Sequence, residues 1–194
     1  MSLIRAFIAI ELPTIVQQHL DQAVAELSQK MAGMPVRWLP AVNIHLTIKF
    51  LGDVSSQNLE ILKEMLQTEA ISHKSFEFSI GGLGAFPSMH RPRVIWTAIE
   101  APPALGSLQT SIDNSLARLG YAREERPFSP HLTFGRISRS ATVGDVRDIA
   151  DHLQRSRVGF IGLVQVREVC LIRSELKPGG AVYTRLFSAA LPAV

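Results

Sequence analysis

Two short stretches of the chain contain the same three residues, His-Leu-Thr, each followed by an apolar residue. The first is "NIHLTIKFLG" at residues 43–52, and the second is "PHLTFGR" at residues 130–136. Imidazole has an unperturbed pKa of ~6.5, so a histidine can give or take a proton near neutral pH. A threonine hydroxyl can hydrogen bond to an anionic oxygen. These residue types therefore suit acid–base chemistry at a phosphate.

The spacing within each stretch places the two polar side chains together. Residues i and i+2 of a strand face the same way, so His45 lies beside Thr47 and His131 beside Thr133. If the two strands face each other, one histidine can remove a proton from an attacking hydroxyl or water while the other protonates the leaving oxygen. Each such group typically contributes about 10² to 10⁴ in rate. The threonines would hold the non-bridging phosphate oxygens as charge develops.

The residues alone leave a simpler explanation open. Threonine is a good strand former, so the repeated letters also fit two ordinary strands. A metal site is not expected, because His45 and His131 lack His-x-x-x-His spacing and have no cysteine or acidic cluster nearby. The acid–base scheme requires no metal and no cofactor.

The composition indicates an ordinary globular protein. The chain has 194 residues, 46% of them hydrophobic, and a formal net charge of +3, which suits an anionic ligand. The single cysteine, Cys170, lies in the apolar run "EVCLIRS" and is predicted to be a buried structural thiol in a reducing cytoplasm. The apolar run 6–10 is too short for a signal peptide, and no run is long enough to span a membrane. We expect a cytoplasmic monomer.

The order of predicted elements favours an α+β fold with antiparallel sheets in one domain, residues 1–194. Strand pairs outnumber simple alternation, and each half has a helix, a His-Leu-Thr strand and another helix. The stretch 76–86 alternates and then is predicted to turn at its glycines, and 36–43 is predicted to be irregular. The predicted strands are 3–12, 44–51, 93–100, 131–137, 163–172 and 181–187; the predicted helices are 14–33, 56–70, 102–119 and 143–155.

The two motifs and several longer stretches resemble those of a known family. The stretches are "RAFIAIELP", "RWLPAVNIHLTIKFLGDV", "RPRVIWTAI", "RPFSPHLTFGR" and "SELKPGGAVYTRL", in that order along nearly the whole chain. They are similar to the two-histidine phosphoesterases, specifically the 2′-5′ RNA ligase family of RNA 2′,3′-cyclic phosphodiesterases. The resemblance implies a bilobal fold with pseudo-twofold symmetry and a central cleft between two antiparallel sheets.

The same resemblance implies an activity and a set of site residues. The family opens a 2′,3′-cyclic phosphate on RNA or a nucleotide to a 2′-phosphate without metal, and some members also join tRNA halves by a 2′-5′ linkage. By this resemblance His45 donates a proton to the departing 3′-oxygen and His131 is the base that activates water. Thr47 and Thr133 bind the phosphate oxygens, and Arg136 contacts the phosphate.

Other residues near the motifs have more than one possible role. Strand alternation predicts that Lys49 lies on the face of His45, where it either adds positive charge or is a plain surface lysine. Phe7, Trp38 and Phe128 are candidates for stacking on a base, although core packing is the commoner role of such residues. Tyr183 flanks a late hairpin and is assigned no role.

Two alternative functions remain open. One is an RNA-binding module that uses the same cleft without useful turnover, which the basic charge weakly supports. The other is a cyclic phosphodiesterase for a small nucleotide, such as a cyclic ADP-ribose derivative. Rates on RNA ends and on mononucleotides would separate the second alternative from the leading prediction.

Overall fold

The computed structural model describes residues 3–178 and 180–193. Its strands are β1 (Leu3–Ile10), β2 (Val36–Trp38), β3 (Leu46–Ser55), β4 (Phe76–Phe86), β5 (Val94–Glu100), β6 (His131–Ile137), β7 (Phe160–Val166), β8 (Glu168–Lys177) and β9 (Gly180–Ala190). The helices are α1 (Thr14–Lys30), α2 (Leu59–Ile71), α3 (Pro103–Arg118) and α4 (Val143–Arg155), with short 3₁₀ helices η1 (Ala41–Asn43) and η2 (Ser56–Asn58). None of the helices in these residues is long and apolar enough to cross a membrane.

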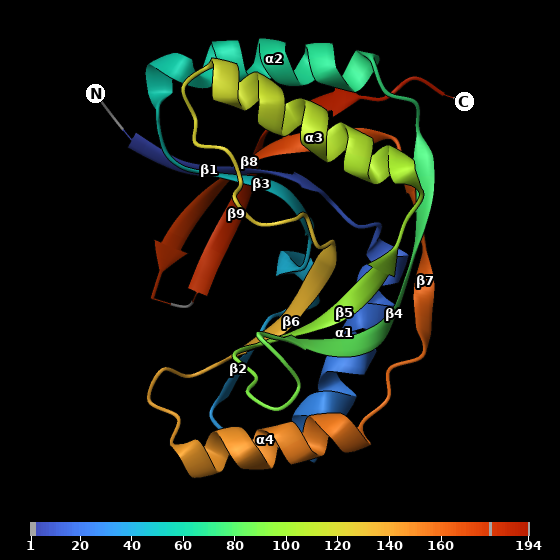
Figure 1. The fold of residues 1–194 in the computed structure, drawn as a ribbon, viewed down its shortest axis with the longest axis vertical. Coiled ribbons are helices and arrows are strands. Elements are labelled where there is room, and N and C mark those ends of the chain that lie inside the picture. Colours follow the sequence, from blue (N-terminus) through green and yellow to red (C-terminus); the bar gives the residue numbers. More distant parts are fainter. Residues whose placement is uncertain (1–2, 179, 194) are drawn as a thin grey trace.

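Two antiparallel sheets lie one above the other in Figure 1. The upper sheet has the strand order β3-β1-β8-β9, and the lower sheet has the order β2-β6-β5-β4-β7. Helices α2 and α3 cover the upper sheet, and α1 packs on the lower sheet behind β4 and β5. Helix α4 lies below the lower sheet, at the bottom of the view. The predicted α+β class with two antiparallel sheets and outer helices is confirmed.

A continuous hydrophobic core joins the two sheets and their helices. Its buried side chains include Ile8 from β1, Leu46 from β3, Leu132 from β6 and Ile112 from α3. The leucines of the two motifs therefore face the core, as expected from strand alternation if the histidines and threonines lie on the other face. Because both motif strands are anchored in the same core, their polar faces hold a fixed relation to each other.

The internal repetition predicted from the sequence is visible in the order of elements. The first half runs α1, β3, α2, and the second runs α3, β6, α4, with one motif strand between each pair of helices. The central strands also correspond, because β1 pairs with β3 and β8 while β5 pairs with β6 and β4. The two halves are therefore built on one plan.

The structure corrects three predictions about strands. The predicted strand 163–172 is two strands, β7 and β8, which separate at Arg167 and join different sheets. Alternation could not reveal this break, because both pieces are apolar. The stretch 76–86 does not turn at its glycines: β4 continues to Phe86 through an irregularity between Gly81 and Gly84. Residues 36–38 form the short strand β2 instead of an irregular segment.

Gly84 is required by the packing of Trp96. A Cβ at Gly84 would lie 2.2 Å from the Trp96 ring, which also contacts Phe86. We therefore expect Gly84→Ala to lower the free energy of unfolding by about 1 to 3 kcal/mol through overpacking. Chemical denaturation, with the midpoint and slope fitted separately, measures this change.

Gly106 provides the matched control for this substitution. It lies in α3, is exposed, and nothing surrounds its Cβ position within 4 Å. Gly106→Ala should raise stability by about 0.5 to 1 kcal/mol, because alanine loses less backbone entropy in a helix. If both variants change stability equally, Trp96 does not fill the space above Gly84 as described.

Candidate active site

The first motif presents its polar side chains on the face of the upper sheet that is turned away from α2 and α3. Thr47 pairs with Ala9 of β1, and Ala9 lies in a small cluster with Phe7 on this face. His45 immediately precedes β3, and its ring stacks on Phe7 with centres 4.6 Å apart. The Tyr183 ring meets His45 edge-on at 5.1 Å. Two aromatic rings thus fix the orientation of the His45 imidazole.

A β-bulge follows the first motif and reverses the alternation. Lys49 pairs with Ile8 and Thr47 pairs with Ala9, so Ile48 has no partner in the register. Phe50, which follows Lys49, pairs with Phe7 and therefore lies on the same face as Thr47.

The bulge places Lys49 away from the motif face, so the interpretation of Lys49 as a residue on the face of His45 was wrong. Its side chain is buried and donates to the Asp113 carboxylate of α3 at 2.6 Å and to the Ala122 carbonyl at 2.7 Å. The strict alternation used in the prediction fails at Ile48. Through its hydrogen bond to Ala122, Lys49 holds the segment that follows α3. In the same segment, the backbone N–H of Glu124 also donates to Asp113.

The second motif has the same geometry on the lower sheet. His131 pairs with Ala98 and Thr133 with Trp96, so both motif side chains share one face of the sheet. Gly135 pairs with Ile95, which leaves Phe134 without a partner. The bulge therefore falls on the residue directly after the threonine in both motifs.

His131 is oriented by its own set of neighbours. Its Nδ1 lies 2.8 Å from the Ser129 carbonyl. Because a carbonyl only accepts, Nδ1 carries the hydrogen, and Nε2 is left for a ligand. The Phe86 ring meets the imidazole edge-on at 4.9 Å, and Trp96 lies at 6.2 Å. Neither Phe86 nor Trp96 was predicted as a neighbour of His131, because neither adjoins a motif along the chain.

The second bulge also determines the position of Arg136. Without it, Arg136 would lie on the core face, because its position differs from that of His131 by five, an odd number. With Phe134 unpaired, Arg136 pairs with Val94 and shares the face of Thr133 and His131. The structure thus brings the arginine to the same surface as the second motif, where its side chain is exposed.

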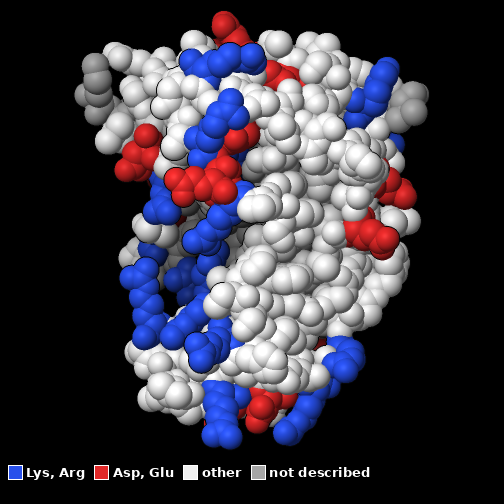
Figure 2. Space-filling view, viewed as in Figure 1, with Lys and Arg blue, Asp and Glu red and all other residues white. Residues whose placement is uncertain are grey.

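The two motif strands are neighbours although they belong to different sheets. β3 and β6 contact each other, and both lie near the middle of the molecule in Figure 1. Figure 2 shows a hollow on this side, at the level of β6 and the β8–β9 hairpin, with Lys and Arg side chains around it. The two motifs thus come from contacting strands of different sheets, one in each lobe.

Burial lowers the pKa of His45 from its ordinary value of 6.5 to about 4, and a hydrogen bond of the ring to the backbone of Asn43 opposes this only in part. Desolvation disfavours the imidazolium ion because the surrounding rings offer it no counter-charge. In the free protein at neutral pH, His45 is therefore an uncharged imidazole.

Asn43 also connects His45 to the late hairpin. Its side-chain amide donates to the carbonyl of Ala181 on β9 at 3.1 Å. Tyr183, two residues further along β9, is the residue whose ring contacts His45. The β8–β9 hairpin and η1 are thus fixed to each other at the first motif. Tyr183, to which the sequence assigned no role, contacts His45 here.

The aromatic residues proposed for stacking lie in different places. Phe7 is on the motif face, but it is only 3% exposed and its ring is covered by His45. Trp38 and Phe128 pack against the core, the commoner role considered for them. Phe50, which was not singled out, is 63% exposed on the motif face, with its ring 6.1 Å from Phe7. Of these four rings, that of Phe50 is the most exposed to solvent.

Glu11, Glu168 and Cys170 place potential metal ligands within 4.8 Å of one another. However, Arg185 forms ion pairs with both carboxylates, and Ser188 donates to Glu168. Burial, with the nearby Glu11 charge, raises the pKa of the Cys170 thiol to about 12, so it stays protonated. This donor set suits a structural ion pair better than a metal. Cys170 is the buried thiol that was predicted.

Comparison with known proteins agrees with this geometry. Residues 10–96 and 99–183 match the family model described as LigT like Phosphoesterase, and each segment contains one motif. The chain is 34% identical to the RNA 2′,3′-cyclic phosphodiesterase of Methanothermobacter thermautotrophicus, over 93% of this chain and 95% of that protein. It is 30% identical to the protein of the same name from Archaeoglobus fulgidus, over 94% and 97%.

A solved structure shows the same arrangement. The crystal structure of Escherichia coli LigT complexed with 3′-AMP superposes with a TM-score of 0.78 at 27% identity, covering 98% of this chain and 99% of that one. Fold and motifs together define a two-lobed phosphoesterase. The chain belongs to the LigT-like phosphoesterase family, which confirms the family predicted from its sequence.

The environment of His45 makes its titration a direct test of the aromatic contacts. With ¹³C-labelled histidine, the NMR signal of His45 should titrate with a midpoint near 4 in the free protein. Tyr183→Ala removes one of the covering rings, so water enters and the pKa should rise toward 6.5. The neighbouring Val182→Ala is the control, because Val182 lies on the opposite face of β9. An unchanged midpoint in Tyr183→Ala would contradict the assigned contact.

Proposed function

We propose that this protein is an RNA 2′,3′-cyclic phosphodiesterase that acts by two-histidine acid–base catalysis. The observation that carries the proposal is the pair of motif strands, one from each lobe, that present histidine and threonine beside each other in the same way. The predicted enzyme class is supported by relatives of that name, which match nearly the whole chain.

The proposed reaction opens the cyclic phosphate by attack of water. The water oxygen forms a bond to phosphorus while the bond from phosphorus to the 3′-oxygen breaks. His131 accepts the proton of the attacking water, and its Nδ1 hydrogen bond to Ser129 leaves Nε2 available for this. His45 gives a proton to the departing 3′-oxygen. The products are a 2′-phosphate and a 3′-hydroxyl.

The threonines are proposed to bind the phosphate that reacts. Thr47 and Thr133 lie on the same faces as their histidines and are only partly buried. Their hydroxyls would donate to the non-bridging oxygens, where negative charge increases in the transition state. Arg136 adds a guanidinium on the side of the second motif. The scheme uses only side chains of the protein, and we propose that it requires no metal.

The role of His45 as proton donor requires the substrate. The free imidazole is uncharged at neutral pH because its pKa is about 4. A bound phosphodiester anion favours the imidazolium and raises this pKa, since it supplies the opposite charge that the aromatic rings lack. The proton on His45 is therefore taken up together with the substrate. In the reverse direction the same two groups would exchange roles, which allows 2′-5′ ligation.

The remaining features of the proposal concern the whole chain. Residues 1–194 act as one two-lobed domain, because the core is shared by both sheets. A monomer suffices, since both motifs come from one chain. The substrate is an RNA end or a nucleotide with a 2′,3′-cyclic phosphate. A reducing cytoplasm suits the single unpaired Cys170.

The decisive experiment supplies a 2′,3′-cyclic nucleotide or RNA end in the presence of EDTA. We expect hydrolysis to the 2′-phosphate at an undiminished rate, and a loss of about 10² to 10⁴ in kcat for His45→Ala and for His131→Ala. Product identity by phosphorus NMR separates the 2′-phosphate from the 3′-phosphate. Full activity in either variant would overturn the mechanism. Binding of RNA without turnover would favour a binding module, and turnover restricted to small nucleotides would favour the other alternative.

The threonine hydroxyls can be removed with little change of shape. Thr47→Val and Thr133→Val should each lower kcat by about 10², because one donor to the charged phosphate oxygens is lost. Thr184→Val is the matched control, since Thr184 is exposed on the opposite face of β9 from Tyr183. Steady-state kinetics on a cyclic mononucleotide measure the effect. If both motif variants match the control, the hydroxyls do not bind the reacting phosphate.

A further inference from the structure

Two arginines lie directly opposite each other at the edge of the lower sheet. Arg37 of β2 pairs with Arg136 of β6, and both side chains are exposed. Like charges in this arrangement are unfavourable in a sheet. Within residues 3–178 and 180–193, neither guanidinium forms an ion pair with a carboxylate. The pair is therefore a concentrated, uncompensated positive charge.

The register fixes the face on which this charge lies. The neighbours of Arg37 in β2, Val36 and Trp38, pack against the core. Arg37 consequently projects to the other side, which is the side of Thr133 and His131. The arginine pair thus continues the surface of the second motif toward the edge of the sheet.

The arginines are displaced from the reacting phosphate along this surface. On the neighbouring strand β5, the partner of His131 is Ala98 and the partner of Arg136 is Val94. These partners are four positions apart, so Arg136 lies about 13 Å from His131 along the strand direction. Arg37 is one strand further out, by about 4.8 Å. The side chain of Arg136 is long enough to extend toward a phosphate bound at the histidines. Arg37 is further from that phosphate, so its guanidinium would meet only a ligand that extends beyond one nucleotide.

We propose that Arg37, beside Arg136, binds the RNA backbone phosphate that precedes the cyclic end. This inference rests on the proposed function and specifies its substrate class, an RNA end in preference to a cyclic mononucleotide. A mononucleotide has no such phosphate, so it leaves the charge of Arg37 unused. A guanidinium suits this role because it binds phosphate oxygens through two parallel hydrogen bonds.

The test compares a 2′,3′-cyclic mononucleotide with a pentanucleotide that ends in the same cyclic nucleotide. For Arg37→Gln, kcat/KM on the pentanucleotide should fall about tenfold, the equivalent of one charge-assisted contact. The mononucleotide should change less than twofold. The salt dependence of pentanucleotide binding should also weaken, with the logarithmic slope reduced by about 0.7 for one phosphate of a single strand. Arg37→Lys should retain the salt slope but lose part of the affinity.

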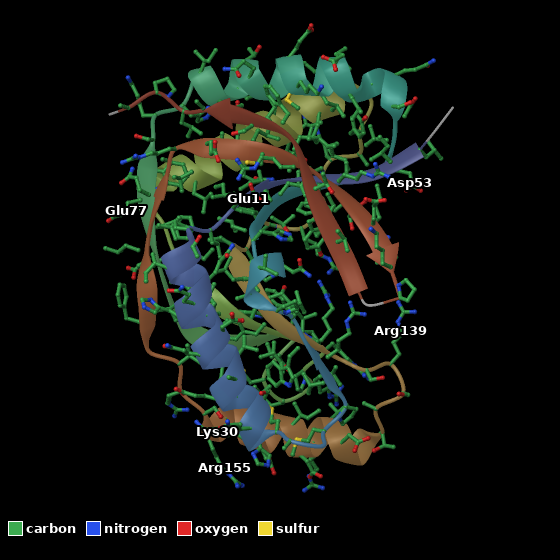
Figure 3. The ribbon with its side chains drawn as sticks, turned by 180° about the vertical axis from the view of Figure 1, so that it is seen from behind. Glu11, Lys30, Asp53, Glu77, Arg139 and Arg155 are labelled. Carbon is green, nitrogen blue, oxygen red and sulfur yellow. The ribbon has the colours of Figure 1, made fainter. Side chains whose placement is uncertain are left out.

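Arg155→Gln provides the control for a general change of charge. Arg155 is exposed on α4 at the far end of the molecule in Figure 3. The Arg155→Gln substitution should leave the ratio of kcat/KM on the pentanucleotide to kcat/KM on the mononucleotide unchanged. Equal losses on both substrates in Arg37→Gln, or no loss on either, would overturn the inference.

A failure of the proposed function can be recognised separately. In that case the parent protein hydrolyses neither substrate. The inference is then tested by fluorescence anisotropy with a labelled pentanucleotide that carries a 2′-phosphate end. Weaker binding and a lower salt slope in Arg37→Gln support the contact, and unchanged binding overturns it.

Discussion

One unpaired residue after each threonine determines how this site is built. Ile48 and Phe134 interrupt the alternation of β3 and β6 at the same point of each motif. A bulge is the simplest way to transfer every following side chain to the other face of a strand. It keeps the histidine and threonine on one face while the third residue after the threonine joins them. The surfaces beside the motifs, Phe50 in one lobe and Arg136 in the other, exist only because of these bulges.

The two halves share a plan but differ in chemistry at corresponding positions. Phe50 corresponds to Arg136, and the buried Lys49 corresponds to Gly135, which lies against the Trp38 ring. The Lys49 charge is directed into the protein and is compensated by Asp113. At these corresponding positions, the motif face of the first lobe has an aromatic ring and that of the second lobe has a guanidinium. Under the proposed function, this difference gives the two histidines a substrate site with unlike ends.

The sequence was sufficient for the parts of the structure that depend on local patterns. Helical spacing located the four long helices, and period-two spacing placed His131 and Thr133 on one face of their strand. It was not sufficient where pairing decides the outcome. The break at Arg167 and the position of Lys49 depend on partner strands that are distant in the chain. The contacts of Tyr183 and Trp96 with the histidines likewise arise only when the sheets form. Family resemblance supplied Arg136, which alternation alone would have placed on the wrong face.

The covering of His45 has a consequence for the order of events at the site. Phe7 and Tyr183 hold the imidazole in one orientation, but they exclude the water that would stabilise its charge. In the free protein, the contacts that orient the His45 ring therefore also disfavour its protonated form. In the proposed mechanism a substrate anion resolves this conflict, because it stabilises the imidazolium beside the reacting oxygen. An uncharged ligand of the same shape would not charge His45, so the proposed protonation step favours a phosphodiester.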